Sequence, residues 1–204
     1  MGYFTTVLGS VYTTTEELEA VTAFSASPAG ALFGGPGHGY DAITLERFLA
    51  GQYGLYIMLG AALMALLTVT RHTRAEERSG RAELVRANVV GRSAQLTAAL
   101  TLTALMCVAA AVLVAGVLLA AGYDAAGSVL FGASAGAAGL AFAGIAAIAV
   151  QVFSYPRAAS GLSGAVLGGA FALRGIGDMA AVQDGGLAWL SWLSPIGWSQ
   201  QTAP

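Results

Sequence analysis

Two groups of residues in this sequence have types and spacings that could carry chemistry. The string GASAG, from Gly132 to Gly136, matches the GxSxG pattern, in which a serine nucleophile sits on a strained turn between a strand and a helix. Such a serine needs a base within hydrogen-bond reach. The two histidines, His38 and His72, fall outside the apolar run that contains Ser134. An intramembrane serine hydrolase is therefore a disfavoured alternative, and we expect Ser134 to bond a helix carbonyl one turn back.

A charged pair forms the second group. Arg174 and Asp178 stand four residues apart, so their side chains share one face of a helix and can pair. The pair lies close to one end of an apolar segment. This position favours an interfacial ion pair in which the Arg174 side chain extends outward to water. A role in gating or in substrate contact is the alternative.

The sequence offers no other group with the composition of a catalytic or metal site. No cluster of histidine and acidic residues has metal-ligand spacing. The single cysteine, Cys107, lies in an apolar run, so neither a disulfide framework nor a cysteine-based metal site is expected. We therefore expect no catalytic residue, no metal and no cofactor held by this chain, which is not predicted to be an enzyme.

The composition shows which elements must position these residues. Hydrophobic residues make up 56% of the 204 residues, and only 10% are charged, whereas soluble domains carry about 25% charged residues. Nine arginines against eleven acids give a net charge of −2, which excludes a basic nucleic-acid-binding protein. The three longest uncharged stretches contain 23, 31 and 32 residues. A membrane-spanning helix needs about 20 apolar residues, so the chain is predicted to be an integral membrane protein.

The predicted fold class is all-α, a polytopic helix bundle of about four transmembrane helices in the plasma membrane. The expected spans are 48–70, 95–121, 127–152 and 158–178. Together with a cytoplasmic loop at 71–93, they form a transmembrane bundle over residues 47–178, flanked by extracytoplasmic segments at 1–46 and 179–204. Six of the nine arginines lie in that loop, and the excess of positive charge predicts that it faces the cytoplasm.

Two short helices are expected outside the membrane. Thr14 and Glu17 have the spacing of a capping box, which predicts a helix in the N-terminal segment that stops at Ser27–Pro28. Three tryptophans in the segment Gly185–Trp198 favour a helix lying on the membrane surface, because amphipathic rings prefer the headgroup zone.

Within the spans, two pairs of glycines have a spacing that favours close helix packing. Gly132–Gly136 and Gly164–Gly168 match the small-xxx-small pattern, which lets the backbones of two helices approach. Both pairs therefore favour a bundle, although neither identifies the helix against which it packs.

The loop between the first two spans carries most of the functional signal. Thr73 and Glu76 have capping-box spacing, which predicts a helix from Thr73 to about Val89. The loop is longer than the two to eight residues that commonly connect neighbouring helices. A docking element is therefore favoured over a solvated connector whose arginines touch lipid phosphates. The residues expected to couple to a partner are Glu76, Glu77, Gly80, Arg81, Glu83, Leu84 and Arg86.

This loop resembles a known family. The string AEERSGRAELVRANVVGR is similar to the segment of ABC-2-type transporter permeases in which a charged, glycine-containing run precedes a glutamate and an aliphatic residue. The residues on this pattern are Glu77, Gly80, Glu83, Leu84, Gly91 and Arg92. Arg81 departs from it by replacing the usual threonine, and Val89 or Val90 replaces a common proline. With RHTRAEE and LSPIGW, these departures resemble the actinobacterial subgroup of polyketide-antibiotic and multidrug exporters.

The resemblance implies a permease component of an ABC exporter that forms part of the translocation pathway. ATP would then be bound by a separate ATP-binding subunit, because this chain has no lysine and so no GxxxxGK[ST] phosphate loop. Further implied partners are the remaining half of the permease or a second permease copy, membrane lipids and a hydrophobic small molecule. Family permeases have six spans per half, so the four spans here are expected to be the second to fifth of the first half of a truncated permease. The alternative is a structural or assembly membrane protein without transport activity.

Overall fold

The computed structural model describes residues 23–24, 26–37, 44–78, 91 and 93–200. These residues form helices and no strand. Four of the helices are long and apolar enough to cross a membrane. They are α4 (Leu45–Thr70), α7 (Ala94–Ala120), α8 (Ala125–Val152) and α9 (Pro156–Val182). The predicted all-α membrane helix bundle is therefore confirmed, and the chain is a multi-pass membrane protein.

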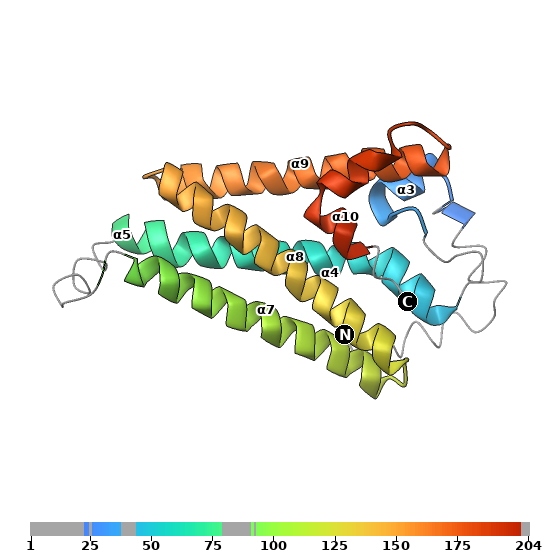
Figure 1. Ribbon diagram of the computed structural model, residues 1–204, viewed down its shortest axis with the longest axis horizontal. Coiled ribbons are helices and arrows are strands. Elements are labelled where there is room, and N and C mark those ends of the chain that lie inside the picture. Colours follow the sequence, from blue (N-terminus) through green and yellow to red (C-terminus); the bar gives the residue numbers. More distant parts are fainter. Residues whose placement is uncertain (1–22, 25, 38–43, 79–90, 92, 201–204) are drawn as a thin grey trace.

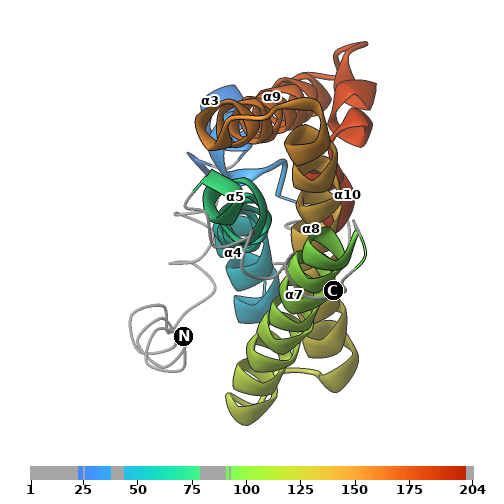
Figure 2. The same ribbon diagram turned by 90° about the vertical axis from the view of Figure 1, so that its left-hand side faces the viewer.

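Helices α4 and α8 form the centre of the bundle, since they contact each other and each contacts both α7 and α9. Figures 1 and 2 show α7 and α9 on opposite sides of the pair formed by α4 and α8. One end of the bundle carries the base of the charged loop and the α8–α9 junction, whereas the other end carries the α7–α8 turn (Figure 1). That turn is closed by Gly122, whose φ of 89° is a left-handed conformation that favours glycine, and by Asp124, whose carboxylate accepts a hydrogen bond from the Gly127 amide.

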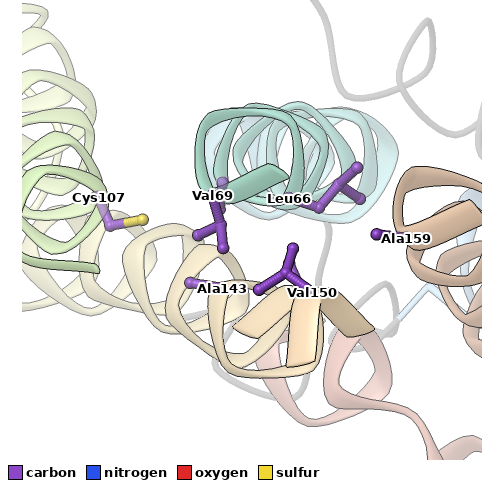
Figure 3. Close-up of a cluster of buried hydrophobic side chains, with 8 residues drawn as sticks. Leu66, Val69, Cys107, Ala143, Val150 and Ala159 are labelled. Atoms are coloured by element: carbon purple, nitrogen blue, oxygen red, sulfur yellow. The ribbon is translucent and has the colours of Figure 1, made fainter. Parts of the chain in front are cut away.

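Small side chains allow the four helices to pack closely. A buried cluster shared by all of them has few large side chains, as Figure 3 shows. Its members are Ala65, Leu66, Val69, Cys107, Ala143, Ala146, Val150 and Ala159. Because alanine and glycine put little between two backbones, the helices can pack by direct van der Waals contact rather than through long side chains.

The two predicted glycine pairs have different surroundings. A Cβ atom added at Gly136 would lie 3.0 Å from the Cβ of Ala111 and 3.2 Å from the Cys107 carbonyl oxygen, both on α7. A Cβ added at Gly132 would overlap the Ala111 carbonyl oxygen. The Gly132–Gly136 pair therefore lies in the contact between α8 and α7. At Gly164 and Gly168 on α9, by contrast, no described atom lies within 4 Å of an added Cβ.

A short helix that was not predicted, α3 (Pro28–Gly34), precedes the first long helix. The side chain of Ser27 caps it by accepting a hydrogen bond from the Gly30 amide at 3.0 Å. Pro28, at the first position of this helix, has no N–H group that would need a bonding partner. The Ser27–Pro28 step that was expected to stop a helix therefore also begins one. The predicted helix around Thr14 lies outside the described residues.

The prediction of a single surface helix over Gly185–Trp198 is wrong. The segment instead forms a 3-10 helix, η3 (Ala188–Leu193), and then a separate helix, α10 (Pro195–Gln200). Ser194–Pro195 separates them, and α10 turns back into the bundle (Figure 1). Ile196 on α10 is fully buried in a cluster with Leu55, Ala62, Phe142 and Ala170. The tryptophan side chains remain more than half exposed, and their place in the headgroup zone stays a prediction.

The arrangement of the ends gives a test of orientation. Ser154, in the α8–α9 junction, and Gln183, after α9, are exposed at opposite ends of the bundle. In a Cys107→Ala background, we expect Gln183→Cys to react with a membrane-impermeant maleimide in intact cells and Ser154→Cys to react only after permeabilisation. The reason is the arginine-rich loop at the Ser154 end, which favours the cytoplasm. Labelling of Ser154→Cys in intact cells would reverse the orientation.

Candidate functional site: the polar junction at the base of the charged loop

Helix α4 does not end where the loop begins. It continues through a π-helical turn, η2 (Arg71–Ala75), into α5 (Glu76–Arg78). The predicted capping box at Thr73 is therefore wrong, because Thr73 lies inside a continuous helix. Its hydroxyl donates to the Val69 carbonyl oxygen at 2.6 Å, one turn back. The first span and the start of the loop thus form one continuous helix.

Backbone carbonyls of the π-helical turn are also bonded by another helix. Such turns insert an extra residue into a helix and often occur at functional sites. Gln95, on α7, donates from Nε2 to the carbonyl oxygens of His72 at 3.3 Å and Thr73 at 3.2 Å. The helix that follows the loop therefore holds the helix that precedes it.

Arg74 connects the same turn to a third helix. Its Nε donates to the Val150 carbonyl oxygen near the end of α8 at 2.5 Å, and its Nη1 lies 2.5 Å from a carboxylate oxygen of Glu77. The two side chains are 24% and 27% exposed, so the pair is only partly screened by water. Hydrogen bonds from a charged donor are stronger than those between two neutral groups. Arg74 thus joins the base of the loop to α8.

A cavity of about 310 Å³ lies in this junction. Its lining includes Thr73, Arg74, Glu77, Ser93, Gln95, Leu96, Val150 and Gln151. We refer to the bonds made by Arg74, Glu77 and Gln95 as the loop clamp. The clamp brings the two ends of the charged loop together with the end of α8, so these three elements are positioned as a unit.

The predicted coupling residues fall into two sets. Glu76 and Glu77 are described, and both face neighbours within the chain: Glu76 lies 2.9 Å from Nδ1 of His72, and Glu77 pairs with Arg74. The others, Gly80, Arg81, Glu83, Leu84 and Arg86, lie outside the described residues. Sequence reasoning missed Arg74 and Gln95, although a glutamine next to an apolar span is a polar group that needs bonding partners.

The predicted Arg174–Asp178 pair is present, but Arg174 does not extend outward. Its side chain is fully buried, with Nη1 3.1 Å from Oδ2 of Asp178 and 3.2 Å from Oε1 of Gln200 on α10. Its Nη2 donates to the Leu32 carbonyl oxygen on α3 at 2.6 Å, and its guanidinium lies 5.0 Å from the Phe171 ring centroid. Arg174 did not reach the surface because α3 and α10 cover it and supply oxygen acceptors.

The serine of the GxSxG string has the role expected of a helix serine. The Ser134 hydroxyl donates to the Phe131 carbonyl oxygen at 2.8 Å, inside α8. His72 belongs to η2, at the opposite end of the bundle from the start of α8. Over the described residues, no group of three or more histidine, cysteine or acidic side chains could hold a metal ion. The geometry therefore gives no support to the hydrolase alternative.

The fold and the loop clamp together define a multi-pass membrane protein with a charged loop fixed to its helices. Comparison with known proteins identifies the class as a transport permease. A family model described as the C-terminal domain of the multidrug efflux system permease Rv1217c matches residues 1–203. The chain belongs to this family, which is named after a transport permease.

The similarity to an individual relative is substantial. The chain is 43% identical over 185 residues to the multidrug efflux system permease protein Rv1217c of Mycobacterium tuberculosis (strain ATCC 25618 / H37Rv). The match covers 91% of this chain but only 32% of the relative, so the chain spans about a third of the relative's length. The family model describes a C-terminal domain, which gives no support to the expected place in the first half of a permease.

Proposed function

We propose that this chain is a membrane component of an ABC-2-type exporter and couples to a separate ATP-binding subunit through the loop at 71–93. The main support is the loop clamp. A helix that continues rigidly from a span can transmit a partner's movement, whereas a flexible connection would absorb it. Arg74 and Gln95 fix the base of the loop to α8 and α7, so a force on the loop would reach three spans.

The proposal places ATP on the partner subunit and the pathway between this chain and further permease segments. A relative about three times as long supports the participation of such segments, supplied either by the rest of the same permease or by a second copy. The proposed cargo is a hydrophobic small molecule, such as an antibiotic or another drug, since the relative is described as a multidrug efflux permease.

The test uses the full-length permease that carries this chain, together with its ATP-binding subunit. We expect Glu83→Arg and Gly80→Leu to lower ethidium efflux and ethidium-stimulated ATPase activity about tenfold, a size typical of coupling between two sites, or to abolish co-purification of the subunit. Reversing a charge or adding bulk on the loop would disturb the docked surface. Membrane insertion should remain normal, and Ser154→Arg, which adds charge at the same end of the bundle, is the control.

The rival role for the loop, binding of lipid phosphates by its arginines, predicts a different pattern. Under it, Glu83→Arg and Gly80→Leu would be harmless and only losses such as Arg81→Ala and Arg86→Ala would have an effect. If both loop substitutions leave co-purification and efflux unchanged, the coupling role is wrong.

A second arm separates docking from transmission. Gln95→Leu removes the donor that bonds the π-helical turn, but it leaves the loop surface intact. We expect co-purification to persist while ethidium efflux per ATP hydrolysed falls. Gln151→Leu is the matched control, because among the described residues Gln151 bonds only the Ala147 carbonyl oxygen of its own helix. Equal efflux in both variants would show that the clamp transmits nothing.

A further inference from the structure

A second cavity lies at the other end of the bundle, far from the loop clamp. It has a volume of about 290 Å³ and lies between the start of α4, the end of α7 and the start of α8. Its size is at the lower limit of ligand pockets in proteins. Since the clamp and this cavity lie at opposite ends of α8, the cavity is separate from the site described above.

The walls of this cavity are mostly apolar, and its edge is polar. Leu49, Ala50, Leu118 and Phe131 line it with buried side chains. Arg47 and Asp124 also contribute to the lining, and the Asp124 side chain caps α8. An apolar chamber with a few polar groups at one side is the usual form of a site for a small amphipathic molecule.

One wall carries a hydroxyl with an unused hydrogen bond. Ser128 lines the cavity and is only 2% exposed, yet its Oγ has no hydrogen-bond partner in the described part of the chain. Other buried hydroxyls in the spans behave differently: those of Thr103, Ser134 and Ser163 each donate to a carbonyl of their own helix. A buried polar atom without a partner is rare and needs an explanation. A bound molecule would supply the missing partner.

We infer that this cavity binds a small molecule with an apolar, ring-sized body and one hydrogen-bonding group, which meets the Ser128 hydroxyl. The body lies against Leu118 and Phe131, and any charged or polar end reaches the edge near Arg47 and Asp124. Two sources offer this chemistry: a dissolved amphiphile, or a bilayer lipid that places its apolar part in the cavity and a polar group at Ser128. This inference does not depend on coupling to an ATP-binding subunit, so each of the two proposals can be tested separately.

The test uses benzophenone as the probe, in the full-length permease. Benzophenone has two rings, one carbonyl that can accept from the Ser128 hydroxyl, and a photoreactive centre that attaches to nearby C–H bonds. After irradiation, peptide mass spectrometry should find saturable attachment to Leu49, Leu118 or Phe131. Attachment to the exposed α7 residues Val112 and Leu113 should rise linearly with concentration, as expected for a lipid-facing surface.

Variants of the cavity give matched controls. We expect Ser128→Ala to weaken saturable attachment about fivefold, the size of one net hydrogen bond, and Ala50→Phe to remove it by filling the chamber. Val129→Phe, which adds the same bulk at an exposed position of α8, should leave it unchanged. Thermal unfolding of each variant, followed by maleimide reaction of the buried Cys107, separates loss of the site from loss of the fold.

The same measurements distinguish the two sources. If a lipid chain fills the cavity, added lipid should weaken attachment at least about tenfold, and the purified protein should retain a lipid that Ala50→Phe loses. If a dissolved amphiphile is the natural occupant, added lipid should have no effect. Linear attachment at the cavity walls, or saturable attachment that Ala50→Phe leaves unchanged in a folded protein, would overturn the proposal.

Discussion

Replacing Arg174 by methionine is expected to destabilise the helix bundle by roughly 3–5 kcal/mol, because it leaves the Asp178 carboxylate buried without its partner. The substitution also removes the donors to the Leu32 carbonyl and to Gln200. Three segments would then lose their common contact: α3, α9 and α10. The temperature at which the buried Cys107 begins to react with a fluorescent maleimide measures the loss.

Two further variants show whether the burial of Arg174 is the cause. Arg157→Met removes an arginine from an exposed position on the same helix and should change the reaction temperature little. The double variant Arg174→Met with Asp178→Leu should recover part of the loss, since it leaves no uncompensated charge. If Arg174→Met behaves like Arg157→Met, the buried contacts contribute nothing to stability.

The second large effect on stability is expected in α8. Adding one methyl group should destabilise the fold at a glycine that contacts α7 and stabilise it at a glycine that contacts nothing in the described part of the chain. Gly132→Ala places a Cβ against the Ala111 carbonyl oxygen, so the helices must move apart, at a cost of about 1–3 kcal/mol for overpacking. Gly144→Ala meets no described atom within 4 Å and should stabilise α8 by up to about 1 kcal/mol through helix propensity.

The same maleimide reaction measures both glycine variants, and the comparison is informative because both lie in α8. Gly164→Ala on α9, which also meets open space, extends the control to the other predicted glycine pair. Equal shifts for Gly132→Ala and Gly144→Ala would mean that α7 and α8 do not approach as closely as the structure places them.

The sequence predicted the four long helices closely because charge is excluded from a membrane core and therefore marks where each apolar helix must end. The second span was expected at 95–121 and α7 covers Ala94–Ala120; the third was expected at 127–152 and α8 covers Ala125–Val152. The fourth was underestimated at 158–178, because Arg174 and Asp178 suggested an interface. Helix α9 extends to Val182, since both charges are bonded inside the protein.

The contacts that could not be predicted join residues far apart in the chain. Nothing local to Leu32 shows that its carbonyl meets an arginine 142 residues later, and nothing local to Gln95 shows that it bonds carbonyls before the loop. The π-helical turn is bonded in the same way, by Gln95 on α7 and through Arg74 to Val150 on α8. Local spacing gave Thr73 a capping role, whereas its place in a continuous helix required knowledge of the neighbouring helices.

The positions of Arg174's partners along the chain also set the order in which its bonds can form during synthesis. The ribosome makes Leu32 long before Arg174, but Gln200 emerges 26 residues after it. An arginine within a newly inserted span costs about 2.5–3.5 kcal/mol during insertion. When α9 leaves the translocon, the Arg174 guanidinium can already bond Asp178 and the Leu32 carbonyl, whereas α10 has not yet been synthesised. The N-terminal segment with Leu32 is therefore already made when the fourth span inserts, and α10 supplies the last of these partners.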